Sequence, residues 1–118
     1  MATLGYREVE ITIDGNQVVC KPKRARLYWE KGPDKVRWVY PTIPSDLELR
    51  IEWDSPKKPC QSIRSRRSDT LPGGRALVTA GNLRNRGVFK YKVSAFDRQG
   101  RMVAWCDPDV DNRPTPPG

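Results

Sequence analysis

The chain of 118 residues is long enough for one domain and hardly long enough for two. It carries 22 basic and 14 acidic residues, a net charge of +8, and 36% apolar residues, a composition that excludes a wholly disordered chain and favours one modest core. No apolar run approaches the roughly 20 residues of a membrane span. The first residues also lack the apolar segment of a signal peptide, so we expect a cytoplasmic protein without a membrane partner.

Short stretches in which apolar and polar residues alternate predict strands along most of the chain. No stretch of useful length has helical periodicity, and Gly, Pro and Asp residues separate the alternating stretches at a spacing typical of sandwiches. We therefore predict one all-β domain over residues 1–110, a Greek-key β-sandwich of about 7–8 strands. In chain order, the predicted strands cover residues 9–13, 18–20, 25–29, 36–40, 47–53, 75–80, 89–95 and 101–106.

Two stretches lose the alternation. Residues 54–74 combine Pro and Gly with Ser and Arg, which predicts a long irregular loop, and such loops inside compact domains are often functional. Residues 111–118 are rich in Pro and predict an extended tail after the domain.

The positive charge is concentrated in the second half of the chain. Residues 57–101 hold twelve basic and two acidic residues, which leaves ten basic and twelve acidic residues elsewhere. If the loops of this half meet at one end of the sandwich, they form a focused positive patch suited to an anionic partner. The candidate partner-binding residues are Lys57, Lys58, Arg64, Arg66, Arg67, Arg84 and Arg86.

This patch has three interpretations. The first is a non-catalytic adaptor that docks on the acidic surface of a larger protein. The second is non-specific binding to the phosphate backbone of nucleic acid, although residues 54–88 contain no aromatic side chain on which bases could stack. The third is a solvated loop that only aids solubility. The oligomeric state, monomer or dimer, stays open because edge strands invite pairing.

The stretch Gly87-Val88-Phe89-Lys90-Tyr91-Lys92-Val93 is similar to the Gly-x-aromatic-x-aromatic-x-Cys strand of cupredoxins. The Asp107-Pro108-Asp109-Val110 ending resembles small bacterial cupredoxin-like proteins, in which the last strand runs into Asp-Pro and an apolar residue. The resemblance spans residues 9–110 and implies a Greek-key sandwich that is cupredoxin-like or immunoglobulin-like. Val93 stands where the copper-binding members have a ligating Cys, and the chain has no histidine, so we expect no copper.

Residues for other chemistry are also missing from the sequence. The absence of histidine removes the commonest general base and the usual partner of a Ser or Cys nucleophile, and no phosphate-binding glycine motif is present. The acidic run from Asp107 to Asn112 opens like a calcium loop, but position six is Asn112 instead of Gly and position twelve is Gly118 instead of Glu. We expect no catalytic site, no cofactor and no metal. An enzyme would need an unrecognised Lys or carboxylate site.

The three cysteines and four tryptophans are interpreted mainly as packing residues. Cys20 and Cys106 are expected as core or strand-end thiols and Cys60 as a loop thiol, because free Cys behaves as a small hydrophobe. A Cys20–Cys106 disulfide is conceivable between the terminal strands, but a reducing compartment argues against it. Trp105 alternates ambiguously with its neighbours, and it becomes a candidate interface anchor if it is exposed.

Overall fold

A computed structural model describes residues 5–40, 47–61, 63–71, 74–79 and 81–117, with the backbone alone in 63–71 and 74–78. These residues form ten strands and no helix. None of them therefore provides a helix that could cross a membrane. The strands are β1 (Tyr6–Asp14), β2 (Gln17–Lys21), β3 (Arg24–Tyr28), β4 (Lys35–Tyr40), β5 (Glu48–Trp53), β6 (Ile63–Leu71), β7 (Gly74–Thr79), β8 (Gly87–Phe96), β9 (Met102–Cys106) and β10 (Asp109–Arg113).

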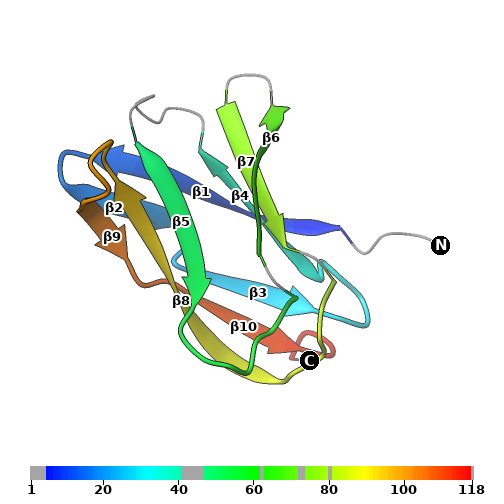
Figure 1. Cartoon of the computed structure of the whole chain (residues 1–118). Helices are drawn as coiled ribbons and strands as arrows, with labels where there is room; N and C mark the ends of the chain where they lie inside the picture. The colour runs from blue at the N-terminus through cyan, green and yellow to red at the C-terminus, as the bar shows by residue number, and fades with distance from the viewer. Residues whose placement is uncertain (1–4, 41–46, 62, 72–73, 80, 118) are drawn as a thin grey trace.

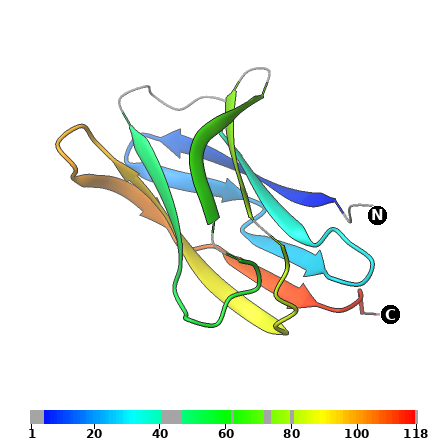
Figure 2. The same cartoon turned by 45° about the vertical axis from the view of Figure 1, so that its right-hand side comes forward.

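The strands build two sheets that face each other, which confirms the predicted all-β sandwich (Figure 1, Figure 2). One sheet has the order β2-β1-β4-β7-β6, and the other has the order β3-β10-β8-β5 with β9 also paired to β8. Both sheets are mixed, because β1 runs parallel to β4 and β10 runs parallel to β3, while the other pairs are antiparallel.

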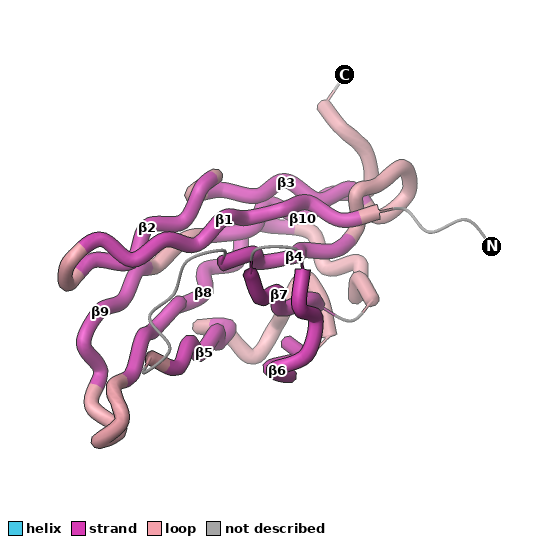
Figure 3. Tube along the Cα trace, turned by 90° about the horizontal axis from the view of Figure 1, so that it is seen from above, coloured by secondary structure: helices cyan, strands magenta, loops and turns pink. Residues whose placement is uncertain are grey.

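Two short connections that contain a proline join consecutive strands that are not paired with each other. The chain leaves β2 at Lys21 and enters β3 in the opposite sheet after Pro22 and Lys23. Within the second sheet, β9 and β10 are separated by Asp107 and Pro108 and pair with different halves of β8. A proline cannot donate to a ladder, so each of these prolines ends the pairing of the strand before it. β2 and β9 lie side by side where the sheets approach each other (Figure 3).

The core lies between the sheets and is filled by the alternate residues that the sequence pattern indicated. Trp38 and Tyr91 are fully buried, and Trp53 completes an aromatic cluster with ring centroids 5.3 to 6.2 Å apart. The Trp38 Nε1–H donates to the Tyr91 hydroxyl at 3.0 Å, which satisfies a polar group in the middle of the core. Burial holds the pKa of the Tyr91 phenol far above its usual value.

The predicted irregular loop over residues 54–74 is wrong for its second half. Residues 63–71 form β6, which pairs with β7 and has a register shift between Arg64 and Asp69. β6 is the edge strand of its sheet, so its backbone pairs with a neighbouring strand on one side only. Polar and basic residues are tolerated at such an edge, and the prolines of this region, at 56, 59 and 72, fall outside the strand. Residues 72 and 73 lie outside the described residues.

The predicted boundary between the domain and a tail at residue 111 is also wrong. Strand β10 continues to Arg113, and both Asp111 and Asn112 are buried in it. Two consecutive polar residues after Asp-Pro look like a turn in the sequence, but here they pair with β3 and β8. The part of the chain without regular structure begins at Pro114.

Candidate functional site

Three loops meet at one end of the sandwich, where β3, β5, β7 and β10 finish (Figure 1). The loops are residues 29–34, 54–61 and 81–86, and with the last residues of β10 we call them the loop end. Backbone hydrogen bonds join them directly: the Leu83 N–H donates to the Pro59 carbonyl at 2.9 Å and the Gln61 N–H donates to the Gly81 carbonyl at 3.0 Å. The Trp29 N–H donates to the Arg113 carbonyl at 3.0 Å, which attaches the first loop to β10.

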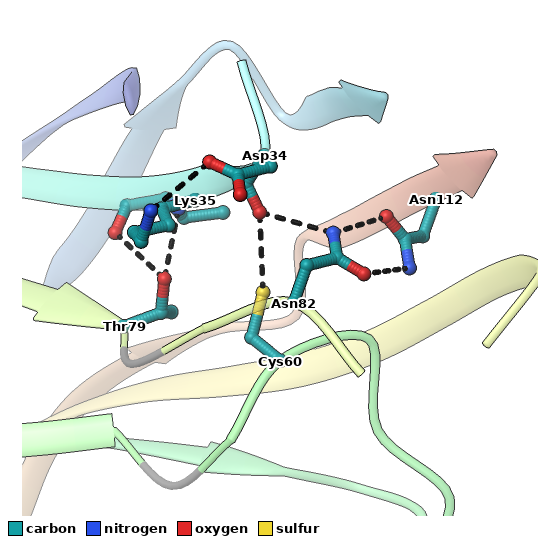
Figure 4. Close-up of polar contacts among 7 residues, drawn as sticks. Asp34, Lys35, Cys60, Thr79, Asn82 and Asn112 are labelled. Atoms are coloured by element: carbon teal, nitrogen blue, oxygen red, sulfur yellow. Dashed lines mark hydrogen bonds and ion pairs between the residues drawn. The ribbon is translucent and has the colours of Figure 1, made fainter. Parts of the chain in front are cut away.

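The side chains of two asparagines, Asn82 and Asn112, connect the loops by hydrogen bonds (Figure 4). Asn112, which is fully buried, and Asn82 exchange two amide hydrogen bonds of 2.8 and 3.0 Å. The second amide hydrogen of Asn112 goes to the Asn85 carbonyl at 2.9 Å, and that of Asn82 goes to the Asp34 carbonyl at 3.0 Å. Because carbonyl oxygens only accept, these contacts fix the orientation of both amides, and the network is fully satisfied.

Further contacts join the loops to one another and join the end of β7 to β4. The Cys60 thiol lies 3.8 Å from the Asp34 carbonyl, and the Asn85 side chain donates to the Lys58 carbonyl at 2.8 Å. At the end of β7, the buried Thr79 hydroxyl accepts from the Val36 N–H at 3.0 Å and lies 3.3 Å from the Val36 carbonyl (Figure 4). Burial raises the pKa of the Cys60 thiol to about 11, so this thiol stays protonated at neutral pH.

Four of the predicted basic residues lie on two neighbouring loops of this end. Lys57, Arg84 and Arg86 are exposed and Lys58 is partly exposed. Asp54 is the only acidic residue in 54–61 and 81–86, so these two loops carry a net charge of +3. Arg84 has a φ of 60°, in the left-handed region, and its N–H donates to the Asn82 side chain at 2.7 Å. The asparagine network therefore also sets the conformation from which the Arg84 side chain projects.

An apolar residue is exposed among these cations. Leu83 is 41% exposed although its own backbone is held against Pro59. Val88, at the start of β8, is also exposed, at 48%. The loop end thus presents exposed apolar side chains and exposed basic side chains on the same loops, and protein–protein interfaces use both kinds.

The other three predicted site residues lie in a strand and not in these loops. Arg64, Arg66 and Arg67 belong to strand β6, and their side chains are outside the described residues. Only the start of β6 approaches the loop end, through the short connection from Gln61. Lys57, Lys58, Arg84 and Arg86 therefore lie on neighbouring loops, whereas Arg64, Arg66 and Arg67 belong to a strand.

The described residues contain no group of three or more His, Cys, Asp or Glu side chains that could hold a metal ion.

Trp105 on β9 is 53% exposed, which meets the condition that the sequence analysis set for a candidate anchor. The Lys92 ammonium lies 5.2 Å from its ring centroid. Trp105 pairs opposite Ser94, near the end of β8 that points away from Gly87, so it does not belong to the loop end.

Three residues of the loop end were missed by sequence reasoning. Asn112 stood out only as a failed calcium-loop position, and no pattern marked Asn82 as part of a site, because buried polar residues produce no periodicity. Leu83 is a single apolar residue between turn-forming residues, and its exposure follows from the hydrogen bond that its backbone makes to Pro59.

No protein-family model and no curated protein sequence matches the chain. Among solved structures, the chain is similar to a cysteine protease inhibitor from Entamoeba histolytica, with a TM-score of 0.55 and 12% sequence identity. The superposition covers 92% of this chain and 96% of the inhibitor. At this identity the likeness shows a shared fold and nothing more. The resemblance to cupredoxins stays a prediction.

Proposed function

We propose that the chain is a non-catalytic protein-binding module that docks through its loop end on an acidic surface of a partner protein. The observation that supports it best is the exposed Leu83 on the same loop as the exposed Arg84 and Arg86, which the asparagine network holds in place. A rigid apolar side chain with a charged rim loses little entropy on binding and can exclude water from the centre of an interface.

The cysteine protease inhibitor with a similar fold acts on another protein. This favours a protein as the partner, and it makes a cysteine protease the first class of partner to test. Papain serves as the reference enzyme, with its hydrolysis of a fluorogenic peptide followed as the purified chain is added. Inhibition that saturates at a one-to-one ratio supports this partner class, and unchanged hydrolysis removes papain-like enzymes from it.

The general proposal is tested by affinity capture from host lysate after nuclease treatment, with variants that differ only at the loop end. Leu83→Asp should weaken capture of a stoichiometric partner by about thirtyfold or more, because a charge replaces the apolar centre. Met102→Asp is the matched control, since Met102 is equally exposed, at 45%, but follows the β8–β9 turn. A partner that both variants retain equally would contradict the proposal.

Charge reversal provides a second pair of variants. Arg86→Glu should weaken binding about tenfold and lower its association rate, because an acidic partner would now meet a like charge. Arg98→Glu, a reversal at an exposed turn residue away from the loop end, should leave binding unchanged.

The same cations suit nucleic-acid phosphates, which is the second candidate function. In that case labelled oligonucleotides would bind with an affinity that falls steeply with salt and depends little on sequence. Leu83→Asp would then act only through its single added negative charge and would have no more effect than Arg86→Glu. A protein interface with an apolar centre instead retains part of its affinity at about 0.5 M salt, where the short Debye length screens exposed charges strongly.

A further inference from the structure

Two cysteine thiols meet at the seam between the two sheets. Cys20 lies near the end of β2, and Cys106 is the last residue of β9. Their sulfur atoms are 3.0 Å apart, although the two residues are separated by 86 positions in the chain. We propose that Cys20 and Cys106 are a redox-active pair that forms a reversible disulfide and thereby joins one sheet to the other.

The geometry needs little change to form the bond. A disulfide has a sulfur–sulfur distance of about 2.05 Å, so the thiols have to approach by roughly 1 Å, which small side-chain rotations supply. β2 and β9 are already in contact along this seam (Figure 3). Cys60 cannot substitute for either partner, because its thiol lies at the loop end against the Asp34 carbonyl.

The two thiols differ in the way that disulfide exchange requires. Cys106 is partly exposed, whereas Cys20 is 8% exposed. The hydrogen bond from the Cys20 thiol lowers the pKa of Cys106, with a smaller contribution from the Lys23 charge, while burial and Asp107 act in the opposite direction. The same hydrogen bond and burial raise the pKa of Cys20 far above its usual value. Cys106 is therefore the accessible nucleophile, and Cys20 is the buried resolving thiol.

A low-molecular-weight disulfide such as oxidised glutathione supplies the oxidant. The Cys106 thiolate attacks one glutathione sulfur, forms a mixed disulfide and releases a glutathione thiolate. Cys20 loses its proton to that thiolate and attacks the Cys106 sulfur. The second glutathione thiolate departs and takes up the proton that Cys106 had released. Two protein thiols and one glutathione disulfide thus become one protein disulfide and two glutathione thiols.

The bond would act on the stability of the whole sandwich. It closes a loop of most of the chain and so restricts the unfolded state strongly. For a domain of this size, the expected rise of the Tm is about 10 °C. The inference does not rest on the proposed binding function, because β2 and β9 contribute no residue to the loop end.

The test is incubation of the full chain with oxidised glutathione, followed by mass spectrometry of the intact protein and of its peptides. Wild type and the control Cys60→Ser should each lose two hydrogens and yield a Cys20–Cys106 peptide pair. Cys20→Ser should stop as a glutathione adduct on Cys106, because no resolving thiol is present. Dithiothreitol should reverse both products.

Two results would overturn the proposal. One is a wild-type protein that stays unmodified, or that accumulates the glutathione adduct without resolving it. The other is a disulfide that forms but leaves the Tm of wild type within about 2 °C of that of the reduced protein, since a bond across the seam must restrict the unfolded chain. Cys106→Ser, which can form neither product, provides the baseline for both measurements.

Discussion

Replacing Asn112 by alanine tests whether the buried amide pair holds the loop end together. The substitution removes the two hydrogen bonds shared with Asn82 and the one to the Asn85 carbonyl, at 2.8, 3.0 and 2.9 Å. Their partners stay buried or half-buried, and each unsatisfied polar group costs about 1–3 kcal/mol. With partial rescue by water in the space left behind, the free energy of unfolding should fall by about 3 kcal/mol.

Urea denaturation followed by tryptophan fluorescence measures this change, and thermal melting should show the Tm lower by roughly 10–15 °C. Asn112→Asp keeps the size of the side chain but presents only acceptors to the Asn85 carbonyl, so it should destabilise the protein at least as much. A loss below about 0.5 kcal/mol for both variants would show that the amide pair does not hold the loops.

Three further substitutions have defined outcomes. Tyr91→Phe should lower the free energy of unfolding by about 1–2 kcal/mol in urea, because the Trp38 Nε1–H loses its 3.0 Å acceptor; an unchanged value would contradict the importance of that bond. Arg84→Gly should raise the free energy of unfolding by about 0.5–1 kcal/mol, because glycine adopts the φ of 60° without strain, and should weaken partner binding; a destabilised variant would refute the strain argument. The pKa of the folded Cys60 thiol is raised to about 11, so between pH 9 and 11 this thiol ionises in the unfolded chain but stays protonated in the folded protein. The free energy of unfolding that is present below pH 9 is therefore partly lost across this window. Cys60→Ala should remove about 2 kcal/mol of that loss. Equal slopes of the free energy of unfolding against pH in wild type and Cys60→Ala would contradict this prediction.

The sequence predicted the parts of the fold that rest on alternation. Eight of the strands were predicted, and four of them have apolar residues at every second position, such as Val36, Trp38 and Tyr40 in β4, because burial on one face imposes that period. β6 and β10 were missed because one is a polar edge strand and the other carries Asp111 and Asn112 into the interior. Backbone pairing of these two strands produces no alternation of apolar and polar residues in the sequence.

The site was predicted in part for a similar reason. Charge concentration along the chain indicated Lys57, Lys58, Arg84 and Arg86, and the topology places their loops at one end of the sandwich. Which arginines join them depends on strand boundaries, so Arg64 was grouped with the loops although it lies in β6. The asparagine pair connects residues 30 positions apart, and long-range hydrogen bonds of this kind cannot be derived from local pattern.

Photo-crosslinking in host cells shows whether the loop end is a protein-binding surface. A photoreactive amino acid replaces Leu83 in one protein and Met102 in another, at similar exposures of 41% and 45%. A discrete protein should be crosslinked from position 83, but not from position 102 and not when Arg86→Glu is added. Crosslinks to nucleic acid from position 83, or the same protein crosslinked from both positions, would contradict it.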